Sequence, residues 1–277
     1  MTEDADALVE LTGVAETLLM PLYNRGTEAA RPHGLINDPW AARTLARVRY
    51  PFAERFGAPN LMHPLRSLMF DREVRRFLAA RPRGTVVSLG EGLETELWRV
   101  DNGEVDWLTV DLPEVIELRR RFLPPIARNR CWAGSAFDLA WMDEVEPARG
   151  VLVLAQGLFG YFAEGEVLAL LRACAERFPG ATALFDMVPH WAAAASGRQK
   201  SDGYRTPPIL WTRDATTWAK LAGLHPAVAE VTAVWLPRGR GIGFGVAYPV
   251  LRRVPGARRL LPFAIRIRFA GAITPRS

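Results

Sequence analysis

The sequence is short of the residues that build metal sites, disulfide frameworks or membrane spans. Among its 277 residues there are two cysteines, Cys131 and Cys174, and four histidines. Two distant cysteines provide neither a disulfide framework nor the spacing of a metal site. Apolar runs such as 191–195 are far shorter than the roughly 20 residues of a membrane-spanning helix. The acidic first ten residues lack the basic-then-apolar order of a secretory signal. We therefore expect a cytoplasmic protein with no bound metal and no membrane span.

Lysine is also scarce, so arginine carries nearly all of the positive charge. Only Lys200 and Lys220 are lysines among 35 basic residues, and the net charge is +5. Residues 231–277 hold nine arginines and no acidic residue. A basic end of this kind could meet nucleic acid, an anionic lipid or an acidic partner, and the alternation of residues 265–269 also suits an edge strand. No recognition-helix or RNP pattern is present in the sequence, so we do not expect a nucleic-acid partner.

The composition, 49% hydrophobic and 23% charged, is ordinary for a globular protein with a sizeable core. The length suits one large domain with a smaller cap. We predict an N-terminal helical cap over residues 1–84, a core over 85–250 and a basic C-terminal extension over 251–277. Within the core, residues 189–212 form an irregular stretch rich in glycine, proline and tryptophan, which predicts an inserted lid.

From residue 85 onward, short apolar strands alternate with helices. This alternation predicts an α/β fold with a mostly parallel, Rossmann-like sheet buried on both faces. Only residues 237–242 separate the last two predicted strands, so these strands should form an antiparallel hairpin. Such a seven-stranded sheet is typical of class I methyltransferases, whereas a dinucleotide-binding sheet would continue parallel. The strands are expected at 85–90, 105–111, 131–137, 150–156, 182–188, 231–236 and 243–250.

A Gly-x-Gly turn, Gly90-Glu91-Gly92, follows the first predicted strand. Glycines at this point let the backbone approach a ligand and direct the next helix N-terminus toward it. A tight turn that needs positive φ would give the same pattern. The third glycine of a dinucleotide-binding motif is absent, because Thr95 occupies its position.

Two carboxylates end consecutive predicted strands, at Asp111 and near Asp138. At the carboxyl edge of an α/β sheet, such groups can accept hydrogen bonds from an adenosine ribose or from the adenine amino group. Each is equally suited to cap the helix that follows it, and the two roles are compatible.

Two motifs carry a specific resemblance to a known family. Leu89–Thr95 reads LGEGLET, and Val110–Val115 reads VDLPEV. Together they resemble the leucine carboxyl methyltransferase family, and within it the bacterial branch around the tetracenomycin polyketide O-methyltransferase. The similarity runs from about residue 14 to 224, with further stretches at 16–19, 22–25, 36–41, 66–71, 155–162 and 178–180.

The resemblance implies a site for S-adenosylmethionine. Gly90 and Gly92 would flank the methionine part of the cofactor, with Glu91 between them. Asp111, followed by Leu112, would hold the ribose.

The remaining cofactor contacts implied by the resemblance come from other parts of the chain. Asp138 and the backbone of Leu139 would meet the adenine. Arg25 and Arg66 would reach in from the helical cap to pair with the cofactor carboxylate, for which a guanidinium group is well suited. Gln156 would contribute from the end of the fourth strand.

The sequence departs from the family pattern at two of these positions. Gln156 stands where the family usually has glutamate, so the charge is lost but hydrogen bonding is retained. Glu91 replaces a usual alanine and would repel the cofactor carboxylate unless its side chain points away.

Methyl transfer mainly requires alignment of the acceptor and exclusion of water. A carboxylate acceptor is already ionised at pH 7, whereas a phenol benefits from a base. His190, which follows the fifth predicted strand, is a candidate base, with a loop histidine as the alternative reading. Tyr161 is a second candidate at the same sheet edge.

The leading hypothesis is an S-adenosylmethionine-dependent O-methyltransferase acting on a small molecule, a polyketide-like phenol or carboxylate. One alternative is a carboxyl methyltransferase of a peptide or protein C-terminus. Another is a protein that keeps the fold but has lost methyl transfer and serves as a binding or regulatory subunit.

Overall fold

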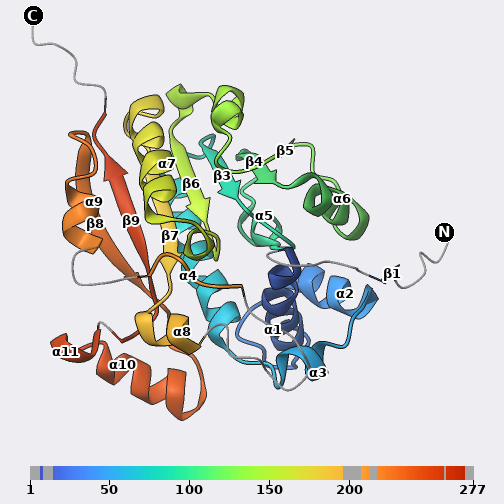
Figure 1. Ribbon diagram of the computed structural model, residues 1–277. Coiled ribbons are helices and arrows are strands. Elements are labelled where there is room, and N and C mark those ends of the chain that lie inside the picture. Colours follow the sequence, from blue (N-terminus) through green and yellow to red (C-terminus); the bar gives the residue numbers. More distant parts are fainter. Residues whose placement is uncertain (1–6, 9–14, 196–206, 213–216, 259, 272–277) are drawn as a thin grey trace, which may run out of the picture.

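The protein is built around one seven-stranded sheet, shown in the computed structural model of Figure 1. The structure describes residues 7–8, 15–195, 207–212, 217–258 and 260–271. The strand order is β5-β4-β3-β6-β7-β9-β8, and β9 runs in the opposite direction to the other six strands. The strands are β3 Thr85–Leu89, β4 Asp106–Asp111, β5 Asn129–Ala133, β6 Val151–Ala155, β7 Thr182–Met187, β8 Val228–Trp235 and β9 Phe263–Phe269. The predicted fold class is therefore confirmed.

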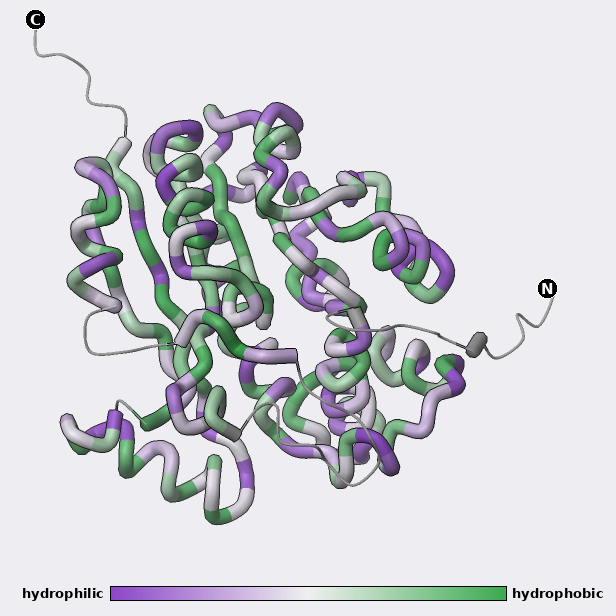
Figure 2. Tube along the Cα trace, in the orientation of Figure 1, coloured by the Kyte–Doolittle hydropathy of each residue, from purple (hydrophilic) through white to green (hydrophobic). Residues whose placement is uncertain are grey.

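Helices cover both faces of the sheet because its central strands are apolar on both sides (Figures 1 and 2). Val87 and Leu89 of β3 pack in one core with α7 (Glu164–Arg177). Val86 points to the opposite core, which contains α4 (Met62–Ala80) and α5 (Glu96–Val100). The other helices flanking the sheet are α6 Pro113–Phe122, α8 His190–Ala195 and α9 Thr217–Ala222. Short 3-10 helices lie at Leu139–Glu144, Pro147–Arg149 and Phe159–Tyr161.

The N-terminal helices pack together beside the carboxyl end of β3. Asp38 caps α2 by accepting a hydrogen bond from the Ala41 amide at 2.9 Å, and Pro39 occupies the first helical turn. Leu19, Leu22 and other apolar residues of this region share a small third core with Leu93. The elements are a short ladder of β1 Ala7–Leu8 with β2 Val48–Arg49, the 3-10 turn Ala15–Leu18, and α1 Leu19–Ala29, α2 Pro39–Arg47 and α3 Phe52–Phe56.

The strand predicted at 243–250 is wrong. Gly243–Ala247 is a π-helical turn that continues into α10 (Tyr248–Leu251), and α11 (Pro255–Arg258) follows. The physical reason is a four-residue spacing of apolar residues from Ile242 to Val254, which is a helical period. The Tyr248 hydroxyl accepts a hydrogen bond from the amide of Leu236 and donates one to the carbonyl of Pro262, which ties α10 to the ends of β8 and β9.

The hairpin at the end of the sheet exists, but β9 pairs with β8 in place of the predicted strand. β9 lies inside residues 251–277, which were expected to extend beyond the core, and it occupies an interior position between β7 and β8. The three-part domain division stays a prediction. Of the predicted lid, residues 196–206 lie outside the described residues. Among the helices that the structure describes, none is both long and apolar enough to cross a membrane.

Candidate active site

A cavity of about 380 Å³ lies where the carboxyl ends of β3, β4, β6 and β7 meet α1 and α4. The carboxyl edge of an open α/β sheet is the usual ligand site of such folds. Most of the predicted site residues line this cavity. They are Arg25, Arg66, Gly90, Glu91, Gly92, Asp111, Leu112, Gln156 and Tyr161.

The glycine turn after β3 forms one wall of the cavity. Gly90 and Gly92 have φ of 60° and 57°, which only glycine adopts without strain. The Gly92 amide donates to Asp111 Oδ2 at 2.6 Å, and the Leu112 amide donates to Oδ1 at 2.8 Å. Burial raises the pKa of Asp111, while these two amides act in the opposite direction. The turn and the carboxylate therefore orient each other, and each oxygen keeps a lone pair for a ligand.

The Glu91 carboxylate is buried between β4 and α6 and is held by protein groups. Its Oε1 lies 3.1 Å from Arg119 Nη2, and its Oε2 accepts a hydrogen bond from the Thr109 hydroxyl at 2.5 Å. Burial raises the pKa of Glu91, and Arg119 opposes that effect. The repulsion that Glu91 would cause beside a cofactor carboxylate is thus avoided.

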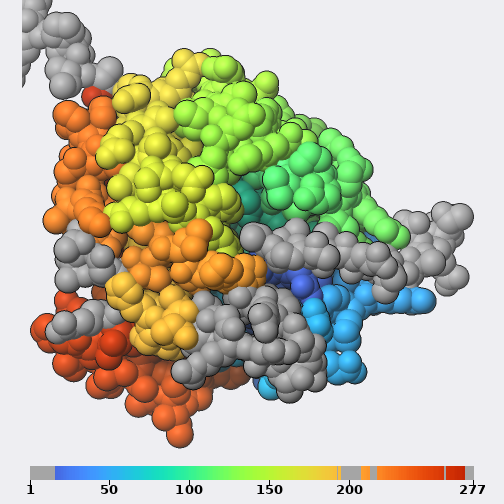
Figure 3. Space-filling model, in the orientation of Figure 1, coloured from blue at the N-terminus to red at the C-terminus, as the bar shows by residue number. Residues whose placement is uncertain are grey.

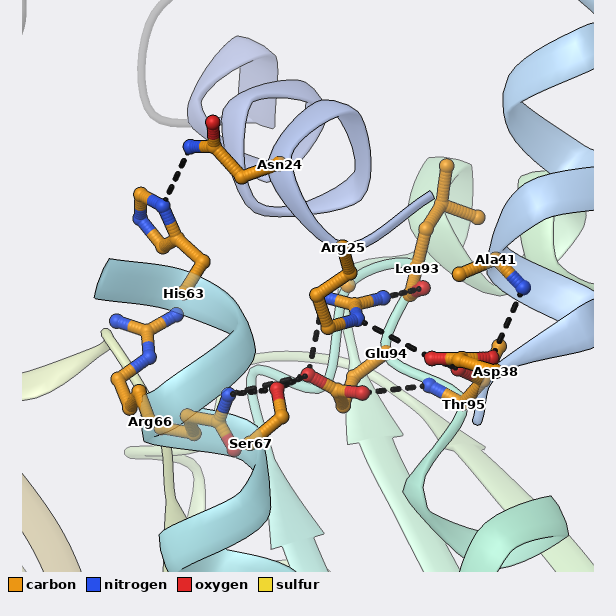
Figure 4. A network of polar contacts seen from close by, with 12 residues as sticks. Asn24, Arg25, Asp38, Ala41, His63, Arg66, Ser67, Leu93, Glu94 and Thr95 are labelled. Atoms are coloured by element: carbon orange, nitrogen blue, oxygen red, sulfur yellow. Dashed lines mark hydrogen bonds and ion pairs between the residues drawn. The ribbon is translucent and has the colours of Figure 1, made fainter. Parts of the chain in front are cut away.

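Arg25 is engaged in a buried polar network (Figure 4). Its Nη1 lies 3.0 Å from Glu94 Oε2, its Nε lies 3.5 Å from Asp38 Oδ2, and its Nη2 donates to the carbonyl of Leu93. Burial alone would raise the pKa of Glu94, but Arg25 and Arg99 outweigh it and hold this pKa well below its usual range. Arg25 therefore has protein partners at all three nitrogens.

Gln156 has a fixed orientation at the edge of the same network. Its Nε2 donates to Ser67 Oγ at 3.2 Å and to Glu94 Oε2 at 3.0 Å. The other amide atom, Oε1, is buried without a hydrogen-bond partner among the described residues. An orphaned acceptor at a cavity wall is a position that a ligand donor would satisfy.

Arg66 reaches the cavity from α4. Its Nη1 donates to Asp186 Oδ2 at 3.0 Å, and Asp186 Oδ1 accepts from the Gly157 amide at 2.5 Å. The Nε of Arg66 is buried and lacks a hydrogen-bond partner in the described part of the chain. Gly157 has φ of 75°, and a Cβ there would lie 2.8 Å from Arg66 Nη1, so the close approach requires glycine.

The structure does not bring Asp138 and Leu139 into the lining of the cavity. Asp138 is exposed and caps the following 3-10 helix by accepting from the Ala140 amide at 3.2 Å. The reason is that β5 ends at Ala133, earlier than predicted, so Gly134–Ala136 are the residues at the strand's carboxyl end. Sequence reasoning missed this turn, although a Gly-Ser pair after a strand is a turn signal.

His190 also lies away from the cavity. It is exposed at the start of α8, and its Nδ1 lies 2.8 Å from the Thr212 hydroxyl. The two preceding residues, Val188 and Pro189, line the cavity, whereas His190 does not. Tyr161 does line the cavity, and burial raises the pKa of its hydroxyl.

His63 is the cavity histidine that sequence reasoning did not select. It belongs to the first turn of α4, lines the cavity, and its Nδ1 lies 2.7 Å from Asn24 Nδ2. Its spacing of three residues from Arg66 places both side chains on one helix face, which was the available signal.

Comparisons with known proteins agree with this geometry. No family model matches the chain. Over 186 residues the chain is 34% identical to the tetracenomycin polyketide synthesis O-methyltransferase TcmP of Streptomyces glaucescens, covering 66% of this chain and 69% of TcmP. Over 188 residues it is 31% identical to the S-adenosyl-L-methionine-dependent methyltransferase dpfgK of Gibberella zeae, covering 61% of this chain and 63% of dpfgK, which is less than two thirds of that relative.

The fold is shared with the plantazolicin methyltransferase BpumL, with a TM-score of 0.51 at 10% identity over 93% of this chain and 100% of that structure. The glycine turn, the carboxylate at the end of β4 and the sheet order are thus found in a chain with clear sequence relatives among methyltransferases. The protein belongs to the family of S-adenosylmethionine-dependent O-methyltransferases that includes TcmP.

Proposed function

We propose that this O-methyltransferase acts on a flat, apolar, polyketide-like phenol or carboxylate. The observation that carries the proposal is that the lining of the cavity has both a polar part and an apolar part. The polar part contains the glycine turn, Asp111, Gln156 and Arg66, and it suits the cofactor. The apolar part suits an aromatic acceptor and is lined by Met20, Met62, Phe162, Val188, Ile209 and Leu236.

The polar part fits the chemical groups of S-adenosylmethionine. Asp111 would accept hydrogen bonds from the ribose hydroxyls, and Gln156 Oε1 would accept one from the cofactor ammonium group. Arg66 would attract the cofactor carboxylate. When bound, the cofactor supplies an electrophilic methyl group on a sulfonium, whose bonding electron pair stays on sulfur as the methyl leaves.

Within the wider family, we propose that the chain falls among the leucine carboxyl methyltransferases, on the motifs LGEGLET and VDLPEV. A peptide or protein C-terminus is therefore the second acceptor class to test. The adenine contacts of Asp138 and Leu139 implied by the resemblance are not supported by their positions, and neither is the role of His190 as a base. Gly134–Ala136 are the candidates to flank the adenine.

The test is transfer of a labelled methyl group from S-adenosylmethionine to two acceptor panels, aromatic phenols and carboxylates on one side and leucine-ended peptides on the other. Calorimetric titration with S-adenosylhomocysteine tests the cofactor site separately. We expect Asp111→Ala to weaken that binding about 10- to 100-fold, because hydrogen bonds to a charged group are lost. Transfer of the labelled methyl group to the peptides, and to none of the phenols or small carboxylates, would overturn the small-molecule proposal.

We also propose that the basic end of the chain meets an anionic lipid surface. In the β8–β9 connection (residues 236–262), Ile242, Val246, Val250 and Val254 are exposed at a four-residue spacing. Exposed arginines such as Arg253 accompany them, and the described residues of the connection include no acid. The connection projects from the lower edge of the molecule (Figure 3). An apolar stripe beside arginines is typical of interfacial binding.

Removing residues 251–277 cannot test this partner, because it would delete the interior strand β9. Point variants avoid the problem. We expect sedimentation with phosphatidylglycerol vesicles but not with phosphatidylcholine vesicles, and a loss in Arg253→Gln/Arg258→Gln that is absent in the control Arg76→Gln/Arg121→Gln. Equal sedimentation of both double variants would reject the proposal. A cytoplasmic location is proposed as well, on the free thiols of Cys131 and Cys174.

A further inference from the structure

The orientation of Asn24 determines which nitrogen of His63 carries a proton. Asn24 Oδ1 accepts a hydrogen bond from the backbone amide of Asn60 at 2.8 Å. Its Nδ2 therefore faces His63 Nδ1, at 2.7 Å. An amide nitrogen only donates hydrogen bonds, so Nδ1 of His63 must be the unprotonated acceptor.

His63 is neutral at physiological pH. Burial lowers its pKa well below the ordinary 6.5, and Arg66 on the same helix and Arg25 on α1 add to this effect. Glu94, from the loop between β3 and α5, acts weakly in the other direction. A neutral imidazole has one proton, and with Nδ1 occupied as an acceptor that proton is on Nε2.

The Nε2–H group is the part of His63 that remains for a ligand. Within the described residues the ring makes one hydrogen bond, at Nδ1. Nε2 has no hydrogen-bond partner there, and it is not fully buried. The residue lines the cavity together with Met62 and Arg66. The ring therefore offers a donor to the cavity and no free lone pair.

We propose that His63 Nε2–H binds the acceptor oxygen as a hydrogen-bond donor, and that the enzyme selects acceptors whose oxygen is ionised without help from a protein base. This inference rests on the proposed small-molecule function. Two other groups of the cavity wall, Asp186 and Tyr161, do not provide a base either. Asp186 is paired with Arg66 and the Gly157 amide, and the buried Tyr161 has a raised pKa and stays protonated.

The chemistry balances without a proton transfer to the protein. A lone pair of the ionised oxygen forms the new O–CH₃ bond, while the electron pair of the broken C–S bond stays on sulfur. The acceptor class is then a carboxylate, or a phenol made acidic by conjugation with a carbonyl group. A donor at 63 stabilises that anion and orients it.

The first test needs no turnover. Long-range ¹H–¹⁵N NMR of ¹⁵N-histidine-labelled protein reports the tautomer of each of the four histidines, and His63→Gln identifies the signal. We expect the Nε2–H form from pH 5.5 to 8.5. In Asn24→Asp the new carboxylate accepts a hydrogen bond, so Nδ1 should become protonated and the pKa of His63 should rise. An Nδ1–H tautomer or a titration near pH 6.5 in the unmodified protein would overturn the proposal.

The second test is kinetic. His63→Leu should lower kcat/KM for the acceptor about 10- to 100-fold, whereas His63→Gln, which keeps a donor, should recover most of it. S-adenosylhomocysteine binding should stay within twofold in both, and the exposed His33→Leu serves as the matched control.

A pH series separates a donor from a base. With phenols of different acidity, the acid limb of kcat/KM should move with the pKa of the phenol. A limb that stays at one pH for every phenol would identify a protein base and refute the inference. If no oxygen acceptor is methylated at all, the proposed function fails, while the NMR result still decides the protonation of His63.

Discussion

Replacing Glu91 by alanine should destabilise this protein. The change leaves Arg119 buried without its carboxylate and removes one of the two acceptors of the Thr109 hydroxyl, the other being Asn129 Oδ1. Breaking a buried ion pair by removing one partner costs about 3–5 kcal/mol. Arg119 keeps hydrogen bonds to the carbonyls of Gly92 and Glu94, at 2.7 and 2.8 Å, which favours the lower end of that range. We expect a loss of about 3 kcal/mol, or about 6–12 °C in Tm.

Urea unfolding at pH 7 measures this loss, and a second variant shows where it originates. Glu91→Ala/Arg119→Met removes the unpaired guanidinium, so it should be more stable than Glu91→Ala alone. Because Arg119 contacts the Gly92 carbonyl, the single variant should also weaken S-adenosylhomocysteine binding. A loss below 1 kcal/mol, or a double variant no more stable than the single, would refute the assignment of Glu91 as a structural partner of Arg119.

Three further predictions follow from single contacts. Hydrogen bonds from Arg240 and the Leu35 amide outweigh burial and lower the pKa of Glu28. The Glu28–Arg240 ion pair therefore stabilises the protein fully above the ordinary pKa of 4.5. This stabilisation is lost as the pH falls through the folded-state pKa. The deficit of Glu28→Gln in urea unfolding, about 1 kcal/mol at pH 7, should vanish in acid. Gly157→Ala should destabilise the protein by about 1–3 kcal/mol through backbone strain, and it should displace the Arg66 guanidinium. Calorimetric titration with S-adenosylhomocysteine should then show weaker binding. In a thiol assay of the native protein, the exposed Cys131 should react. Cys174 should not react, because it is buried and burial raises its pKa to about 12.

Local sequence patterns were enough to predict most of the sheet and the cofactor edge. The apolar runs of β3, β4, β6 and β7 read as strands because both of their faces are buried, and that leaves a continuous hydrophobic signal. The glycine turn was predictable because it follows β3 directly, and the carboxylate of Asp111 because it ends β4. Asp38 and Pro39 likewise marked the start of α2, since capping depends on a few adjacent residues.

Only the tertiary structure decided what depends on distant partners. The interior place of β9 follows from pairing with β7 and from Tyr248 joining two strand ends, and no local period contains that information. The Glu91 carboxylate, in the turn after β3, is paired with Arg119 of α6, so it does not repel the cofactor carboxylate.

The same holds for the histidines. His190 followed a strand and matched the local pattern of a site residue, yet its ring contacts Thr212 outside the cavity. For His63 the one local signal was its three-residue spacing from Arg66, and its protonation depends on Asn24, 39 residues earlier in the chain. A sequence therefore predicts the elements and the turns between them, whereas the charge, tautomer and direction of a side chain are set by the groups that folding brings against it.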